Sequence, residues 1–391
     1  MSTLSQTLSP HHQRAYWGGI FAMTLCVFVL IASEFMPVSL LTPITRDLGV
    51  TEGLAGQGIA ISGALAVLTS LTLSTLAGKM NRKFLLLGMT VLMAVSGLII
   101  ALASSYLMYM VGRAMIGVAI GGFWSMSAAT AIRLVPQHQV TRALAIFNAG
   151  NALATAVAAP LGSYLGATVG WRGAFLCLVP IAVVAFIWQC ISLPSMDANK
   201  SHTSCGAVFR LFSRRMVVVG MIACGLFFMG QFALFTYVRP FLESVTRVNS
   251  LGLSSILLII GVAGFIGTLV VSAFLNRKFY PTLMAVIAIG LMLTGHHVWT
   301  VSLLLGLWGM LATAAPTGWW TWIARTLPDN AEAGGGLMVA VIQLAIALGS
   351  TAGGIVFDRL GWQSTFAMSS VLLLCAGVLT FVTARQKAGA L

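Results

Sequence analysis

Charged side chains are scarce in this sequence. It has 21 Lys or Arg and only 8 Asp or Glu among 391 residues, so 7% are charged, against about 25% in an ordinary soluble domain. Hydrophobic residues make up 59%, and the mean hydropathy is +0.98. So few charges cannot cover the surface of a soluble chain of this length. The composition excludes a cytosolic enzyme, a secreted disulfide scaffold and a disordered chain, and it predicts an all-α integral membrane protein.

The patterns of catalytic, metal and nucleotide sites are also missing. Among the six cysteines there is no CxxC and no His-Cys cluster, and thiols in apolar stretches are ordinary packing residues. The run Gly334-Gly335-Gly336 has no strand before it and no Gly-Lys-Ser/Thr after it, so it is not a phosphate loop. We therefore expect no enzyme, no metal and no cofactor, and an energy source other than ATP.

Cutting the sequence at charges and turn residues gives twelve segments long enough to cross a bilayer. In the first half they are 17–41, 54–76, 84–103, 106–130, 141–168 and 173–193. In the second half they are 216–240, 254–275, 281–299, 301–323, 337–357 and 363–384. One long polar segment divides them six and six. The predicted organisation is a six-helix half at 1–193, a cytoplasmic linker at 194–215 and a second six-helix half at 216–391.

The basic residues predict the orientation. With the N-terminus inside, 15 of the 21 Lys and Arg fall in inside segments, 5 fall in outside loops, and Arg113 alone lies within a span. This bias predicts that both termini are cytoplasmic. The net charge of +13 is then explained by anionic lipid, and no nucleic-acid partner is expected.

The two halves resemble each other at a nearly constant spacing. Four pairs recur in order, at offsets of 191 to 197 residues: Asn81-Arg82-Lys83-Phe84 with Asn276-Arg277-Lys278-Phe279, Arg133 and Pro136 with Arg325 and Pro328, Gly170-Trp171 with Gly361-Trp362, and Glu34-Phe35 with Gln231-Phe232. Four ordered matches predict a pseudo-symmetric pair of halves, with a substrate path between them near the bilayer midplane.

This layout resembles the major facilitator superfamily across the whole chain, and several family motifs are partly present. The loop Gly78 to Lys83, which includes Arg82, is similar to the family's Gly-x-x-x-Asp-Arg-x-Gly-Arg-Lys loop, but it lacks the acid and the second glycine. Two helix motifs also match in part: Arg113, Gly117 and Gly121 on the fourth span, and Gly150, Pro160 and Gly162 on the fifth, where Ala159 replaces a usual glycine.

A narrower resemblance is to the bacterial purine ribonucleoside efflux pumps, in the drug/proton antiporter branch. The stretches that carry it are Glu34–Pro43, Gly121–Ala128, Gly230–Ala233, Phe235–Pro240 and Val339–Ala345. The resemblance implies a monomeric pump of the bacterial inner membrane that exports inosine- or guanosine-like molecules in exchange for protons. Multidrug efflux, sugar efflux and passive facilitation remain alternatives.

Glu34 is the acidic residue that lies clearly within a span, since the other acids fall in loops or at a span's end. It lies 17 residues past Trp17, or roughly 25 Å along a helix and somewhat beyond the midplane. An ionisable group there costs at least a few kcal/mol unless it is paired or hydrated, which favours a proton carrier over a merely structural Glu. Arg113 lies at a similar depth. It is predicted either to pair with Glu34 or only to anchor backbone carbonyls.

Polar and aromatic residues within spans are candidates for binding a small polar substrate. Gln231 occupies the repeat position of Glu34, while Asn148 and Asn151 share a face of the fifth span and Gln343 lies on the eleventh. Their amides are predicted to bond either the substrate or neighbouring helices. Four aromatic side chains are candidates for stacking on a flat base, with packing or lipid contact as the alternative: Phe35, Trp124, Phe232 and Phe235.

Overall fold

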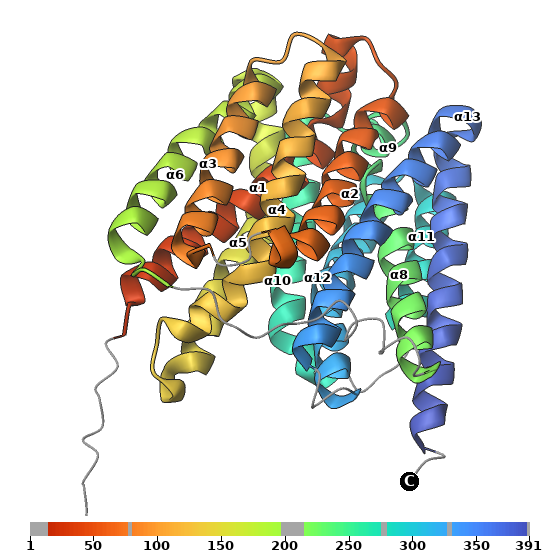
Figure 1. Cartoon of the computed structure of the whole chain (residues 1–391). Helices are drawn as coiled ribbons and strands as arrows, with labels where there is room; N and C mark the ends of the chain where they lie inside the picture. The colour runs from red at the N-terminus through yellow and green to blue at the C-terminus, as the bar shows by residue number, and fades with distance from the viewer. Residues whose placement is uncertain (1–14, 77–79, 197–214, 275–279, 327–330, 389–391) are drawn as a thin grey trace, which may run out of the picture.

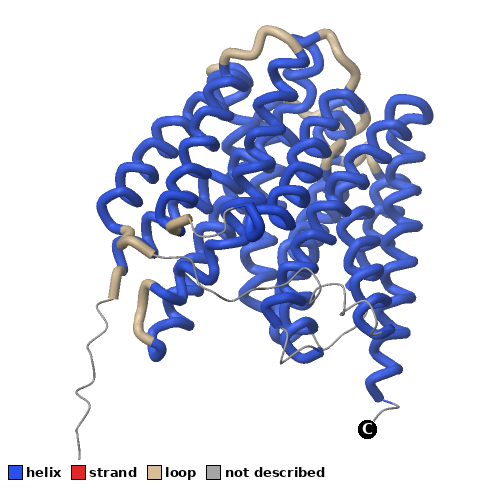
Figure 2. Tube along the Cα trace, viewed as in Figure 1, coloured by secondary structure: helices blue, strands red, loops and turns tan. Residues whose placement is uncertain are grey.

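The structure is a computed structural model that describes residues 15–76, 80–196, 215–274, 280–326 and 331–388. These residues form helices joined by short loops, and no strand occurs among them (Figure 2). The all-α prediction is therefore confirmed. Most of the predicted linker, and Gly78 of the predicted loop motif, lie outside the described residues.

The N-terminal half follows the six predicted segments closely. Its helices are α1 (Trp17–Leu48), α2 (Glu52–Leu76), α3 (Arg82–Ala101), α4 (Tyr106–Arg133), α5 (Val140–Thr168) and α6 (Gly170–Ser192), with a short 3₁₀ turn η1 (Gln137–Gln139). The clear difference is α1, which continues beyond the predicted end at residue 41 and passes through Pro43. It ends at Gly49, whose φ of 64° is the left-handed conformation that glycine adopts without a steric cost.

The C-terminal half contains α8 (Arg215–Phe235), α9 (Val238–Ser244), α10 (Ser250–Phe274), α11 (Tyr280–Thr294), α12 (Val298–Thr326) and α13 (Ala331–Ala388). The range of α13 contains the last two predicted spans, and Gly361 divides it with a non-helical φ of 81° and ψ of 176°. Gly170, its predicted repeat partner, has a φ of 77° where α6 begins. A glycine with a positive φ thus stands before the last predicted span of each half.

Each of the twelve predicted segments contains a described helix, although α11 ends at Thr294 and α12 begins at Val298, so the predicted segment 281–299 spans a break. The helices also differ in length as spans. Among the described residues, ten helices are long and apolar enough to cross a membrane. One of these is the 46-residue stretch Leu337–Val382, which includes both arms of α13, and the apolar helix in α11 is shorter. The apolar surface and the helix lengths agree with a multi-pass membrane protein.

The two halves meet at one end of the molecule. We call the side where α1 begins and α13 ends the termini side, and the side where α1 ends and α2 begins the far side. Figure 1 shows the helices of the two halves drawn together toward the far side and spread apart toward the termini side. Buried apolar side chains form two clusters, one mainly from α1–α6 and one mainly from α8–α13. Helices α2 and α13, and α5 and α10, pack across the boundary.

Candidate functional site

Glu34 lies near the middle of α1, 17 residues after Trp17 and 14 before Leu48. The sequence predicted a position somewhat beyond the bilayer midplane, and that depth stays a prediction. The side chain is only 5% exposed. Glu34 is therefore a buried carboxyl group near the middle of α1, where the charged form needs a partner or water.

Gln343 of α13 is the partner that the structure gives to Glu34. Its Nε2 donates to Glu34 Oε1 over 3.3 Å, across the boundary between the halves. Gln343 is itself buried, and its Oε1 has no hydrogen-bond partner among the described residues. The sequence placed both residues in the site but did not predict that they pair. The pair joins the acid of one half to an amide of the other.

Arg113 is fully buried on α4 and binds oxygen atoms other than those of Glu34. Its Nε donates to Gly58 O over 2.9 Å, its Nη1 to Ser33 O over 2.8 Å, and its Nη2 to Ser62 Oγ over 2.9 Å. Within the described chain, the ion pairs closer than 4 Å are Arg172–Asp47 and Arg239–Glu243. The predicted Arg113–Glu34 ion pair is therefore not formed in this state, and the alternative, anchoring of backbone carbonyls, is what the structure shows.

The Ser33 contact has a local cause. In a regular helix the carbonyl of Ser33 would accept the N–H four residues later, but that residue is Pro37, which has no N–H. Arg113 supplies the missing donor. Arg113 thus fixes the backbone next to Glu34 and brings a positive charge into its neighbourhood without direct contact.

Three phenylalanines meet across the boundary between the halves. Phe35 of α1 stacks on Phe232 of α8 with ring centroids 5.9 Å apart, and Phe235 lies edge-on to both, at 6.5 Å and 6.1 Å. Phe35 follows Glu34 directly on α1, but neighbouring residues of a helix do not face each other. Gln231, next to Phe232, has a buried Oε1 without a partner among the described residues. Two sets of contacts thus cross the boundary, one between Glu34 and Gln343 and one among Phe35, Phe232 and Phe235.

The remaining substrate-binding candidates lie on the N-terminal half. Trp124 of α4 packs edge-on against Phe147 of α5, with centroids 5.9 Å apart. Asn151 is half-buried on α5, while the side chain of Asn148 lies outside the described residues. Their roles stay predictions.

The glycines of the predicted motifs lie at close helix crossings. A Cβ on Gly117 or Gly121 of α4 would collide with the backbone of Ser62 or Ala66 on α2. On α5, a Cβ on Gly150 would meet the carbonyl of Thr24, and one on Gly162 would meet the side chain of Ser39, both on α1. Pro160 lies inside α5 between these two glycines. These residues let α4 and α5 pack directly against their neighbours.

The described part of the loop after α2 contacts the end of α6 and the residues that follow it. Lys83 Nζ donates to Cys190 O over 2.8 Å, and Arg82 N donates to Met196 O over 2.8 Å. Asn81 caps α3 by accepting from Lys83 N. These bonds tie the start of α3 to the end of α6 on the termini side.

Several polar residues outside the predicted site cross the boundary on the far side. Asp358 binds Thr51 and Gly53, Thr351 binds Gln57, Ser254 binds Ser163, and Arg239 binds Ser39. With Gln343–Glu34, these are the cross-boundary hydrogen bonds recorded among the described residues. All lie between the level of Glu34 on α1 and the far side. The sequence did not indicate these contacts, and it placed Asp47 and Glu243 in loops, whereas they lie on α1 and α9.

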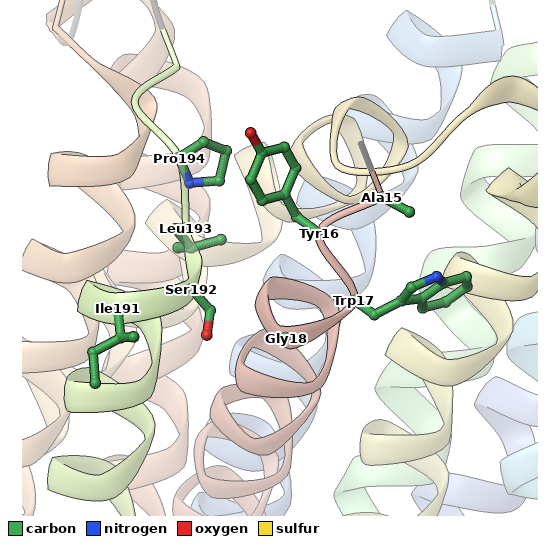
Figure 3. A pocket seen from close by; sticks show the side chains of 8 residues that line it. All are labelled: Ala15, Tyr16, Trp17, Gly18, Ile191, Ser192, Leu193 and Pro194. Carbon is green, nitrogen blue, oxygen red and sulfur yellow. The ribbon is translucent and has the colours of Figure 1, made fainter. Parts of the chain in front are cut away.

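A hollow of about 420 Å³ lies on the termini side, where α1 begins and α6 ends (Figure 3). Its lining runs from Ala15 to Gly18 and from Ile191 to Pro194. Figure 3 shows Tyr16 and Pro194 facing each other across its mouth. It contains none of the predicted site residues and lies at the start of α1, whereas Glu34 lies near the middle of that helix, so the hollow is separate from the candidate site.

Comparisons with known proteins agree with this architecture. A family model described as Major Facilitator Superfamily matches residues 23–284. A protein of Pseudomonas aeruginosa named transcription regulatory protein OpdE is 60% identical over 387 residues, which cover 97% of this chain and 96% of that protein. The Escherichia coli K12 protein named purine ribonucleoside efflux pump NepI is 39% identical over 380 residues, covering 96% and 95%.

Two solved structures of a bacterial homologue of the human lysosomal transporter Spinster have the same fold. The inward-facing, unoccupied form aligns with a TM-score of 0.78 at 13% identity and covers 96% of this chain and 98% of that one. The inward-facing, occupied form aligns with a TM-score of 0.74 at 12% identity and covers 94% and 96%.

Proposed function

This chain belongs to the major facilitator superfamily, and from that premise we propose that it is a proton-coupled exporter of a small polar solute. The observation that carries the proposal is the Glu34–Gln343 hydrogen bond. It supports the proposal because Glu34 is a buried, protonatable group near the middle of α1 and its partner lies across the boundary between the halves, where a substrate path is expected.

The proposed coupling follows from the surroundings of Glu34. A charged carboxylate at this depth is stabilised by the Gln343 amide and by the nearby Arg113, whereas a protonated one needs neither. Protonation therefore weakens one link between the halves. Alternate exposure of Glu34 to the two sides, with substrate and proton competing for the site, would exchange one for the other.

Purine ribonucleosides are the substrates we propose. The stacked Phe35–Phe232 pair offers flat apolar surface, and the free oxygens of Gln231 and Gln343 offer acceptors for the N–H and O–H groups of a base and a ribose. The relative named purine ribonucleoside efflux pump supports the same choice. Sugars and lipophilic drugs are the other substrate classes to test.

We assign the bacterial inner membrane as the location, with both termini cytoplasmic and the chain acting as a monomer. The distribution of Lys and Arg supports the orientation. In that orientation the far side is periplasmic, and the state described here is closed toward the periplasm.

Transport in proteoliposomes tests the proposal. With an imposed proton gradient, purified protein should concentrate radiolabelled inosine or guanosine, and added substrate should drive proton movement in the opposite direction. Glu34→Gln should abolish gradient-driven accumulation and retain exchange of labelled for unlabelled substrate. Glu52→Gln is the matched control: it makes the same chemical change at the start of α2, and it should pump as the unaltered protein does.

Three outcomes contradict parts of the proposal. Full accumulation by Glu34→Gln removes Glu34 from the coupling. Downhill flux without proton movement identifies a passive facilitator. Transport of sugars or cationic drugs, with no nucleoside transport and no rise in melting temperature at high nucleoside concentration, replaces the substrate class.

A regulatory role is a second candidate, favoured by the name of the 60%-identical relative. It is separable from transport in cells. If transcript levels respond to deletion of the gene but not to a chromosomal Glu34→Gln change, the protein has a regulatory function that does not need proton-driven transport.

A further inference from the structure

Asp358 of α13 binds the start of a helix in the other half. Its Oδ1 accepts from Gly53 N over 3.0 Å, and its Oδ2 accepts from Thr51 Oγ1 over 2.6 Å. Gly53 lies in the first turn of α2, where backbone N–H groups have no partner within the helix and the helix dipole favours a negative charge. A carboxylate of the C-terminal half thus satisfies a backbone donor that the N-terminal half leaves free.

Arg239 of α9 makes the complementary contact. Its Nη1 donates to Ser39 O on α1. That carbonyl would normally accept the N–H of the residue four positions later, but the residue is Pro43, which has none. Arg239 is 8% exposed, and its Nη2 forms an ion pair with Glu243 Oε1 at 2.8 Å. A cation of the C-terminal half thus satisfies the backbone acceptor freed by a proline of the N-terminal half.

The other proline of α1 shows why this contact depends on conformation. Pro37 frees Ser33 O, and Arg113 fills it from within the same half. That bond persists however the halves move. The bond from Arg239 to Ser39 O exists only while the halves are together on the far side. Asp358 and its partners on α2 are separated in the same way when the halves part.

We propose that Arg239 and Asp358 form a far-side lock, in which two charged residues of one half close the far side by satisfying unpaired backbone groups of the other. The proposal rests on the alternating-access function proposed above. Opening the far side breaks both contacts and transfers the charges and the backbone groups to water. The lock therefore favours the closed state without making it permanent, because water satisfies the same groups when the gap opens.

The chain offers a matched control pair on the same side. Arg172 also donates to a backbone carbonyl, that of Ala103 over 2.8 Å, and it also pairs with an acid, Asp47. Both partners lie in the N-terminal half. Changes at Arg172 and Asp47 therefore remove the same types of charge and the same types of bond without touching the boundary.

Spin-label distances across the far side test the lock without relying on transport. Labels on cysteines placed at Leu102, which follows α3, and at Leu251, in the first turn of α10, are well exposed at 62% and 71% and lie one in each half. The six native cysteines are first replaced by alanine. Double electron–electron resonance then gives the ratio of far-side-open to far-side-closed molecules.

Asp358→Ala and Arg239→Met should each raise this ratio about fivefold, the effect of losing a charge-assisted hydrogen bond that is partly screened by solvent. Asp47→Ala and Arg172→Met should leave it unchanged. Pro43→Ala is the decisive third variant. It removes no charge and restores an N–H for Ser39 O, so Arg239 loses its unpaired acceptor. This variant should open the far side while its melting temperature is kept or raised.

Equal open fractions in the lock variants and the control variants overturn the proposal, as does a Pro43→Ala protein that stays as closed as the unaltered chain. A general loss of stability does not imitate the expected result, since Pro43→Ala should open the far side without it. The transport assay is scored separately. Altered distances without proton-driven transport refute the proposed function and leave the lock standing, whereas transport with unchanged distances does the reverse.

Discussion

The two halves share a backbone plan but differ in where they hold charge. Gly170 and Gly361 turn the chain at equivalent positions, with φ of 77° and 81°. Gly117 of α4 and Gly309 of α12, 192 residues apart, each press against a backbone carbonyl of a neighbouring helix. At the positions of Glu34 and Arg113, however, the C-terminal half has the amide Gln231 and the buried apolar Leu305.

This difference indicates a division of labour. Glycine positions are set by helix packing, which both halves must satisfy in the same way. A buried charge is costly and needs its own partners, so it is kept only where it has a use. The N-terminal half therefore holds the protonatable group, and the C-terminal half contacts it with the neutral amide of Gln343. Charges of the C-terminal half that reach across the boundary, Arg239 and Asp358, do so on the far side.

The largest effect is expected where the halves differ most, at Arg113. Arg113→Met removes the donors for Ser33 O, Gly58 O and Ser62 Oγ and leaves the carboxylate of Glu34 without a nearby cation. We expect the free energy of unfolding to fall by about 3–5 kcal/mol, as it does when one partner of a buried charge network is removed. Leu305→Met, a volume-conserving change at the repeat position, should cost less than about 1.5 kcal/mol. Melting temperature and folded fraction in detergent measure both.

A double variant tests whether the hydrogen bond from Arg113 to Ser33 O accounts for part of that loss. Adding Pro37→Ala to Arg113→Met gives Ser33 O a helical donor again, and part of the lost stability should return. If Arg113→Met is as stable as Leu305→Met, the hydrogen bonds of Arg113 do not hold α1 and α2 in place.

The course of α1 shows what the sequence could and could not predict. Hydropathy located most of the spanning helices to within a few residues, because spanning length and apolar composition are local properties. It missed the short helix α9, and it ended α1 at residue 41, two residues before Pro43, a residue type that normally stops a helix. The helix continues because Arg239, 200 residues away in the chain, satisfies the freed carbonyl of Ser39. No local pattern encodes that contact.

The candidate site likewise has features that the sequence predicts and features that it does not. Glu34 could be found from the sequence because acids are so scarce within the spans. Its bond to Gln343 could not be predicted, since it depends on how the two halves are rotated against each other. The sequence also left the hydrogen-bond partners of Arg113 undecided, because a backbone carbonyl group has no sequence signature. Pro37 does mark the carbonyl of Ser33 as one without a helical donor.

An intermediate and equal effect is expected where the halves agree in packing. Gly117→Ala and Gly309→Ala each place a methyl group against a carbonyl, of Ser62 or of Ile260. Each substitution should lower the free energy of unfolding by about 1–3 kcal/mol, because backbone atoms cannot move aside as a flexible side chain can. Gly88→Ala is the control, since nothing lies within 4 Å of its Cβ position. A tolerated Gly309→Ala beside a damaging Gly117→Ala would show that the two crossings are not equivalent.

The smallest effect is expected at the paired turns of Gly170 and Gly361. A Cβ at either position meets nothing within 4 Å, so the cost of alanine is only that of the positive φ, roughly 1–2 kcal/mol. At Gly361 the ψ of 176° adds to that cost, because the combination of a positive φ with this ψ is one that glycine alone adopts readily. Because packing plays no part, alanine at Gly361 should lower the melting temperature by at least as much as alanine at Gly170, and asparagine at Gly361 should recover none of the loss. A smaller loss at Gly361 than at Gly170 would mean that the turn at Gly170 is held by contacts of its own half, and the two turns would then not be set by the backbone alone.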